Sequence, residues 1–193
     1  MRSTSQETIA FIRTTDCRII AEVGILNGDT SEKIASHLNE QGALHLFDYE
    51  ERVNAVKARL HACGYDNIVG HANSHKTFDS YNWNLMRMLK QHPQPVFDYV
   101  YLDGAHTWHH DALAFLLFDR MLNVGGYIDF DDYQWSFERS PSLNPRIAPH
   151  VSALYTDTQI KECQVGLVVD LLVKPDRRYT SVVENKIYRK IAP

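Results

Sequence analysis

The sequence has few cysteines and no arrangement of them that suits zinc or a disulfide framework. Cys17, Cys63 and Cys163 are the only three, they are far apart, and none belongs to a Cys-x-x-Cys pair. An odd number of cysteines at such spacing predicts neither disulfide bridges nor a thiolate zinc site. We therefore interpret them as small apolar residues.

A long apolar run and an excess of positive charge are also missing. No segment approaches the roughly 20 apolar residues that a helix needs to cross a bilayer. The 20 Lys and Arg residues against 24 Asp and Glu give a formal net charge of -4, which offers nothing to attract a polyanion. We expect a cytoplasmic protein with neither membrane nor nucleic-acid partners.

What is present suits one compact globular unit. The chain has 193 residues, of which 44% are hydrophobic and 23% charged, close to the averages of soluble globular proteins. A chain of this length leaves little room for a second core of useful size. We therefore expect residues 1–193 to form a single domain.

Apolar runs alternate with helical patterns between residues 18 and 130. The predicted strands are residues 18–23, 43–47, 67–71, 96–102 and 126–130, and the predicted helices are residues 30–38, 50–63, 81–91 and 109–122. In the last helix, the spacing of Leu113, Leu116, Leu117 and Met121 predicts that they face inward. This alternation predicts an α/β fold with a doubly wound, mainly parallel sheet covered on both faces.

The pattern changes after Asp132. Residues 133–149 contain three prolines among aromatic residues, and a helix is predicted over residues 151–161. Residues 165–173 and 181–191 look like strands joined by a turn at residues 174–179, which would make the last strand antiparallel to its neighbour.

Ligands of open α/β sheets bind beyond the carboxyl ends of the strands, so the loop after the first strand is informative. Its residues Gly24 and Gly28 allow close backbone approach, and the helix predicted from Thr30 offers free amides. Leu26 stands where the motif G-x-G-x-x-G has its middle glycine. This departure counts against a dinucleotide pyrophosphate at the start of the helix.

Polar residues follow the next two strands. Asp48 lies at the distance at which an acidic residue binds a ribose hydroxyl in nucleotide-binding α/β folds. The alternative is that Asp48 caps the following helix together with Glu50 and Glu51. Asn73 is placed to contact an adenine edge, although an ordinary turn residue explains it equally well.

The fourth and fifth predicted strands end in carboxylates. Asp103 follows one strand, and Asp131 and Asp132 follow the other. Three carboxylates brought together at neighbouring strand ends would repel one another unless a cation held them, and oxygen ligands suit Mg²⁺. The alternative is that Asp103 and Asp132 cap the following segments and Asp131 bonds to loop amides. Asp129 lies further inside its strand and suits a ligand role less.

His106 follows Asp103 by three residues and is a candidate general base, because imidazole accepts a proton near neutral pH. A loop histidine without a chemical role is the alternative. His109 and His110 lead into a helix and point in different directions, which argues against a zinc site of several histidines.

Together these segments resemble the class I S-adenosylmethionine-dependent methyltransferases, in particular the small family that includes macrolide-sugar O-methyltransferases. The resemblance covers Arg18 to about Tyr133 and rests on AEVGILNGDTSEKIASHL, LFDYEE, DYVYLDGAH and GGYIDFDDY in this order. It implies a seven-stranded, mainly parallel Rossmann-like sheet with an antiparallel last strand.

The resemblance also implies roles for individual residues. Glu22, Gly24 and Gly28 would shape the methionine and ribose part of an S-adenosylmethionine site, and Asp48 would bind the ribose diol. Asp103 with Asp131 or Asp132 would hold Mg²⁺ or a similar divalent cation, and His106 would take the proton of the acceptor. The implied reaction is O-methylation of a small acceptor, a sugar or a phenol.

Residues 133–160 follow the last of these strands, where an acceptor-side insertion is expected. Tyr133, Trp135 and Phe137 could stack on the acceptor ring, or they could fill a second small core or a contact in a homodimer. Two other functions stay open. An NAD-dependent oxidoreductase fits the α/β alternation but lacks the glycine motif and a Tyr-x-x-x-Lys sequence. A non-catalytic nucleotide-binding or scaffold protein fits if the acidic residues only cap helices.

Overall fold

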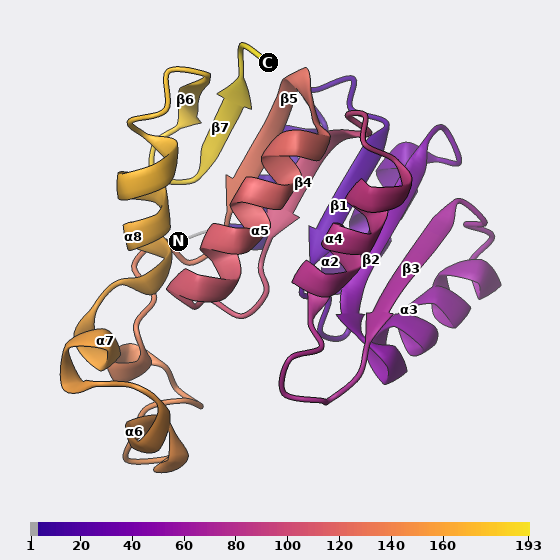
Figure 1. The fold of residues 1–193 in the computed structure, drawn as a ribbon. Coiled ribbons are helices and arrows are strands. Elements are labelled where there is room, and N and C mark those ends of the chain that lie inside the picture. Colours follow the sequence, from indigo (N-terminus) through magenta and orange to yellow (C-terminus); the bar gives the residue numbers. More distant parts are fainter. Residues whose placement is uncertain (1–3) are drawn as a thin grey trace.

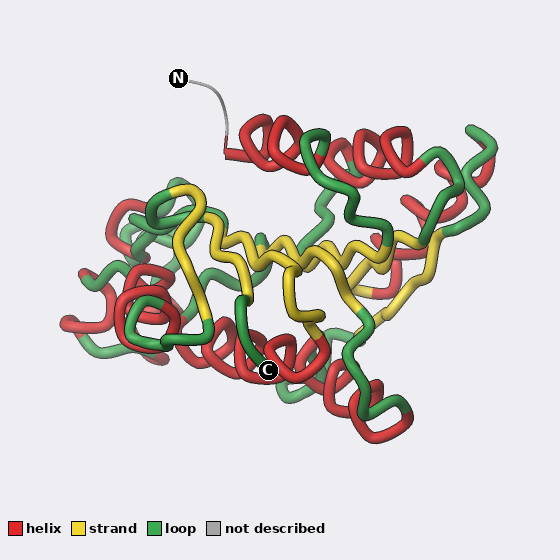
Figure 2. Tube along the Cα trace, turned by 90° about the horizontal axis from the view of Figure 1, so that it is seen from above, coloured by secondary structure: helices red, strands yellow, loops and turns green. Residues whose placement is uncertain are grey.

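The structure, a computed structural model, describes residues 4–193 and contains a seven-stranded sheet between two layers of helices (Figures 1 and 2). The strand order is β3-β2-β1-β4-β5-β7-β6. The strands are β1 (Ile19–Val23), β2 (Ala43–Tyr49), β3 (Ile68–Asn73), β4 (Phe97–Leu102), β5 (Leu122–Phe130), β6 (Tyr179–Val183) and β7 (Ile187–Lys190). The first five are parallel, and β7 is antiparallel to both of its neighbours. The predicted doubly wound α/β architecture is confirmed.

Helices cover both faces of the sheet (Figure 2). The first layer is α1 (Thr4–Ile12), α2 (Asp29–Leu38) and α3 (Glu50–Ala62), and the second is α4 (Tyr81–Gln91), α5 (Trp108–Met121) and α8 (Gln164–Val168). Because alternate side chains of a strand point to opposite faces, each strand contributes to both cores. In β2, for example, Leu46 lies in the core of the α2 and α3 layer, and Phe47 in the core of the α4 and α5 layer.

The predicted strand at residues 165–173 is wrong. These residues form α8 and a following π-helix, Val169–Val173, and both cover the face of the sheet next to α5. The predicted strand at residues 181–191 is instead part of a hairpin, in which β6 and β7 pair with each other and β7 also pairs with β5. A short, continuous apolar run has no period that separates a buried strand from a buried helix. Helix α1 was not predicted either.

The inward face of α5 differs in part from the prediction. Leu117 and Met121 are buried as expected, but Leu113 and Leu116 are 42% and 52% exposed. Phe115 and Phe118 are buried in their place, in the core beside α4 and the sheet. Because the helix contains apolar residues on most of its circumference, the sequence period did not define the buried face.

Residues 133–161 extend beyond the carboxyl end of β5 (Figure 1). They contain a 3₁₀ turn, Phe137–Arg139, and two short helices, α6 (His150–Leu154) and α7 (Asp157–Lys161). The single helix predicted over residues 151–161 is thus divided, because Thr156 starts a new helix with a capping box to Gln159. Among residues 4–193, no helix is long and apolar enough to cross a membrane.

Candidate functional site

A cleft of about 590 Å³ opens at the carboxyl ends of β1, β2, β3 and β4. Five of the residues singled out in the sequence line it, namely Gly24, Asp48, Asn73, Asp103 and His106. The other four, Glu22, Gly28, Asp131 and Asp132, lie around the cleft without lining it. Loops that are far apart in the sequence therefore meet at one edge of the sheet, as parallel strands require.

Gly24 joins the ends of β1 and β4 closely. Its φ is +81°, and a Cβ at this position would lie 1.9 Å from the carbonyl oxygen of Asp103. The backbone N–H of Asp103 donates to the carbonyl of Val23 at 2.9 Å, and that of Gly24 donates to Phe47 at 2.9 Å. Only glycine fits both the conformation and the space here.

Glu22 and Gly28 flank the loop after β1 and do not line the cleft. Glu22 is 1% exposed, and burial raises the pKa of its carboxyl to about 8. Its Oε2 has no hydrogen-bond partner among the residues that the structure describes. Gly28 precedes the first residue of α2 with φ +78°, and a Cβ there would lie 2.6 Å from Val56.

The carboxylate of Asp48 holds the glycine loop against the end of β2. Its Oδ2 accepts from the backbone N–H of Ile25 at 2.9 Å and of Leu26 at 3.3 Å, and its Oδ1 accepts from its neighbour Tyr49 at 2.7 Å. Arg52 adds an ion pair at 3.2 Å. Asp48 is 7% exposed, so its charge is balanced by amides and one guanidinium while one edge still reaches the cleft.

An aromatic pair that sequence reasoning missed forms the neighbouring wall. The rings of Tyr49 and His75 stack at 4.1 Å, and the Arg52 guanidinium lies 5.5 Å from the centre of the Tyr49 ring. Both rings line the cleft next to Asn73, whose side-chain amide donates to the carbonyl of Ser74 at 3.3 Å. Tyr49 ends β2 and His75 follows β3, and no motif in the sequence marks the two rings as a stacked pair.

Asp103, His106 and Asp132 meet at the other side of the cleft. The Nε2 atom of His106 lies 3.3 Å from Oδ1 of Asp103 and 3.9 Å from Oδ2 of Asp132. The hydroxyl of Tyr101 donates to the other oxygen of Asp103 at 3.1 Å. Sequence reasoning placed Asp103, Asp131 and Asp132 in one cluster, and of these Asp103 and Asp132 flank His106.

Burial and charge act in opposite directions on the pKa values of Asp103 and His106. Burial favours the neutral form of each side chain, and the neighbouring opposite charge favours its charged form. Burial raises the pKa of Asp103 to about 6, although His106 beside it lowers that pKa. Burial disfavours the charged form of His106, but the hydrogen bond and charge of Asp103, with further charge from Asp111 and Asp132, raise its pKa above the usual value. His106 and Asp132 also have positive φ angles of 51° and 52°, a conformation that costs free energy and is concentrated at functional sites.

Asp131 pairs with a lysine, and its charge adds to burial in raising the pKa of the neighbouring Asp103. It is 6% exposed, and its Oδ1 lies 3.6 Å from the ammonium of Lys186. Among residues 4–193, no three His, Cys, Asp or Glu side chains are arranged to hold a metal ion. The three acids have the oxygen donors that Mg²⁺ prefers, but Tyr101 and His106 face Asp103, and Lys186 faces Asp131. As arranged here, they do not fit a three-ligand cation site.

Residues 133–161 supply the outer wall of the cleft. Trp135, Ser140, Ser142 and Leu143 line it, and the Trp135 ring lies 5.7 Å from the ring of His106. Phe137 and Tyr155 pack at 4.3 Å in a small core of this segment. Phe137 and Tyr155 thus fill a small core, and Trp135 both packs against this core and lines the cleft.

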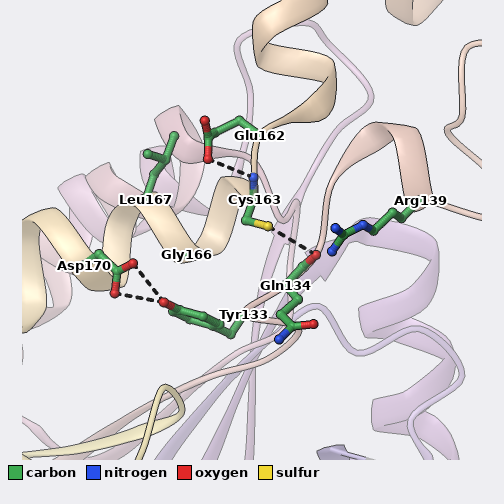
Figure 3. A pocket seen from close by; sticks show the side chains of 8 residues that line it. All are labelled: Tyr133, Gln134, Arg139, Glu162, Cys163, Gly166, Leu167 and Asp170. Atoms are coloured by element: carbon green, nitrogen blue, oxygen red, sulfur yellow. Dashed lines mark hydrogen bonds between the residues drawn. The ribbon is translucent and has the colours of Figure 1, made fainter.

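A second cavity of about 440 Å³ lies between residues 133–139 and α8 (Figure 3). The hydroxyl of Tyr133 donates to both oxygens of Asp170 there, at 2.9 and 2.8 Å. Lys174 pairs with the same carboxylate at 2.6 Å. Neither Asp103 nor His106 lines this cavity, so it is separate from the cleft.

The sequence profile of a family described as "Methyltransferase domain" matches residues 21–133. An uncharacterized protein, R132, of Acanthamoeba polyphaga mimivirus is 29% identical over 106 residues, which are 53% of this chain and 44% of that protein. The chain thus spans less than half the length of this curated relative.

Solved structures share the fold. An O-methyltransferase of Bacillus cereus in complex with SAH superposes with a TM-score of 0.67 at 13% identity, over 97% of this chain and 80% of that one. The O-methyltransferase TomG of Streptomyces achromogenes, in complex with SAM, gives 0.65 at 15% identity, over 97% and 79%. The profile match, which covers more than half of the chain, shows that the chain belongs to the family described as "Methyltransferase domain", and the solved structures show that it shares the fold of these O-methyltransferases.

Proposed function

We propose that this protein transfers a methyl group from S-adenosylmethionine to a hydroxyl oxygen of a small acceptor. One observation carries the proposal: the Gly24 loop and the Asp103–His106 pair line the same cleft. A cofactor held at the glycine loop would therefore present its methyl group toward a residue that accepts protons.

The cofactor would lie along the ends of β1, β2 and β3. Gly24 allows its methionine part to approach the backbone, and Asp48 would accept hydrogen bonds from the ribose diol. Asn73 and the stacked pair of Tyr49 and His75 stand where the adenine would extend. Aromatic faces and a side-chain amide suit a flat heterocycle with polar edges.

Methyl transfer is an in-line displacement at the sulfonium methyl carbon, so the acceptor oxygen must be held about 3 Å from that carbon. With Nε2–H of His106 donating to Asp103, the other ring nitrogen, Nδ1, would take the acceptor proton as the new C–O bond forms and the C–S bond breaks. The products are the methyl ether, S-adenosylhomocysteine and a protonated His106. The carboxylate of Asp103, 3.3 Å away, would orient the imidazole and stabilise its charge.

The acceptor would be a sugar or a phenol. Trp135 offers an aromatic face beside His106, and Ser140 and Ser142 place hydroxyls on the same wall. An aromatic platform with hydroxyl partners suits a ring that carries several hydroxyl groups. Residues 133–160 would thus act as the acceptor-side insertion of a single domain.

A metal-assisted reaction would need a divalent cation at Asp103, Asp131 and Asp132, which are not arranged here as a three-ligand site, so the proposed reaction does not include one. When bound, such an ion would lower the pKa of the acceptor hydroxyl. No step described above depends on it. A methyl-transfer assay with added Mg²⁺ and then with EDTA tests it, because activity that persists in EDTA removes the cation from the reaction.

Calorimetry with S-adenosylmethionine and with NAD tests the cofactor. We expect binding of the first and none of the second, and the reverse result would favour an oxidoreductase. A panel of sugars and phenols with methyl-labelled cofactor then tests the reaction. If the cofactor binds and no panel member is labelled, the proposed acceptor class is wrong. If neither cofactor binds, the enzymatic assignment fails.

A further inference from the structure

Lys186 lies buried behind the acidic side of the cleft. It precedes β7 at the end of the β6–β7 turn, and its side chain is 8% exposed. Its ammonium lies 2.9 Å from Oδ1 of Asp129 and 3.6 Å from Oδ1 of Asp131. A buried ammonium is costly unless carboxylates compensate it, so this position is electrostatically constrained.

The two carboxylates that share Lys186 differ in their other partners. Asp129 is fully buried, and its Oδ2 accepts from the hydroxyls of Thr8 and Tyr99, both at 2.7 Å. Oδ1 of Asp129 and Oδ1 of Asp131 both face the Lys186 ammonium, and neither has a hydrogen-bond partner among the described residues. Without Lys186 both Oδ1 atoms would lose the ammonium beside them, although Oδ2 of Asp129 would keep its two donors.

Lys186 also contacts the groups that hold the reacting side chains. Its ammonium lies 5.4 Å from the centre of the Tyr101 ring, and the hydroxyl of Tyr101 donates to Asp103. Its carbonyl oxygen accepts from the backbone N–H of Phe130, the last residue of β5. The next two residues are Asp131 and Asp132, and Asp132 faces His106.

From these contacts we infer that Lys186 is a positioning residue of the methyl-transfer site. Its charge holds the Asp131 carboxylate, next to Asp132 in the chain, and its ammonium lies beside Tyr101, which donates to Asp103, so that it influences where both acids stand around His106. The inference rests on the proposed function for its effect on turnover, but the position of Asp131 is a separate observable. Lys186 itself does not line the cleft.

The test is a cycle of three variants, Lys186→Met, Asp129→Asn and the double variant. Lys186→Met leaves two carboxylates without their cation and is expected to lose much of its stability, so the double variant is the decisive protein. In the double variant, the carboxamide introduced by Asp129→Asn retains an oxygen for Thr8 and Tyr99, and the buried pair loses both charges together. Asp129→Asn alone is the control, because Lys186 still faces Asp131.

We expect the double variant to fold with a melting temperature between those of Lys186→Met and Asp129→Asn, because only Asp131 then lacks its cation. Its crystal structure should show the Asp131 carboxylate displaced, and its turnover should fall roughly tenfold to a hundredfold, because small displacements of reacting groups are costly. The Kd for S-adenosylmethionine should stay within about twofold of the wild type, since Lys186 is remote from the glycine loop.

An Asp131 carboxylate that stays in place in the double variant would overturn the inference, and so would wild-type turnover in that variant. If the wild type itself transfers no methyl group, the proposed function has failed, and the crystal structure of the double variant still decides whether Lys186 positions Asp131.

Discussion

The two sides of the cleft are held together in different ways. The cofactor rim, residues 24–28 and 48–52, is fixed mainly by its own backbone, because Asp48 accepts three amide N–H groups. The reaction rim, residues 103–107 and 131–135, is fixed by side-chain charges, with His106 between two carboxylates and Lys186 behind a third.

This difference matches what each rim has to do. A carboxylate that accepts several backbone amides holds a loop in one fixed shape, which suits a constant cofactor. The free energy of a partly buried charged side chain changes strongly when it gains or loses a proton, so such side chains suit proton transfer. The reaction rim also contains two non-glycine residues with positive φ angles, His106 and Asp132, as is common at reactive sites. Leu26, with φ 45°, shows that the cofactor rim also departs from ordinary backbone geometry at one residue.

The largest effect is expected where the two rims touch. Gly24→Ala would place a Cβ 1.9 Å from the carbonyl oxygen of Asp103. We expect a loss of roughly 3 kcal/mol or more in the free energy of unfolding, with no measurable binding of S-adenosylmethionine. Chemical denaturation and calorimetry measure the two quantities.

Gly64→Ala is the matched control. Gly64 has a similar φ of +87° but nothing within 4 Å of an added Cβ. It should cost only about 1–2 kcal/mol and leave cofactor binding intact. Equal losses in the two variants would show that backbone strain, and not contact between the rims, limits this position.

The second effect separates chemistry from binding. His106→Asn suits the positive φ of 51°, because asparagine tolerates the left-handed region. We expect turnover to fall by about 10²- to 10⁴-fold, the usual contribution of a general base, with the Kd for S-adenosylmethionine unchanged. Steady-state kinetics and calorimetry provide the measurements.

His61→Asn serves as the control, because His61 pairs with Asp66 on the surface of α3, away from the cleft. It should leave both quantities unchanged. A parallel loss of turnover and cofactor affinity in His106→Asn would instead indicate that His106 maintains the shape of the cleft.

The third effect concerns the strands beneath the cofactor rim. His45 and His71 lie side by side with Nδ1 and Nε2 2.9 Å apart, and burial lowers the pKa of each to about 4. The unfolded chain takes up these protons near pH 6.5 and the folded chain does not. Stability should therefore fall as the pH drops from about 6.5 toward 4, by roughly 2 to 4 kcal/mol between pH 7 and pH 5 for the pair.

The double variant His45→Gln with His71→Gln isolates this contribution. Glu22, Asp103 and Asp111 have raised pKa values, so they act in the opposite direction in both proteins. Denaturation of wild type and variant at pH 7 and pH 5 gives the difference. If the stability of both proteins changes equally with pH, the histidine pair is not the cause.

The smallest effect is expected at the outer wall. Trp135→Ala removes the ring 5.7 Å from His106, and we expect the KM of the acceptor to rise about tenfold, since aromatic contacts of this kind contribute about 1 kcal/mol or slightly more. Cofactor affinity should not change. Trp83→Ala, at a 57% exposed site on α4, is the control, and an equal rise in KM there would contradict a role of Trp135 in acceptor binding.

Much of the fold was predictable because local patterns and tertiary packing agree. In β1–β5 and α2–α5, apolar runs of strand length alternate with helical periods, and the buried side chains of α3, Val53, Val56 and Leu60, are those that the period indicates. The agreement fails at residues 165–173, where a continuous apolar run packs beside α5 as helix. Only the packing partner distinguishes these two outcomes.

The candidate site divides in the same way. The sequence by itself determined which residues stand at strand ends, because parallel strands place their carboxyl ends at one edge, and so Gly24, Asp48, Asp103 and His106 line one cleft. Only the tertiary structure decided which groups face these acids. Lys186 stands more than 50 residues from Asp131 in the chain, and hairpin pairing with β5 brings it there. No spacing in the sequence indicates such a contact, because the attraction between two charges depends on their distance in space and not on their separation along the chain.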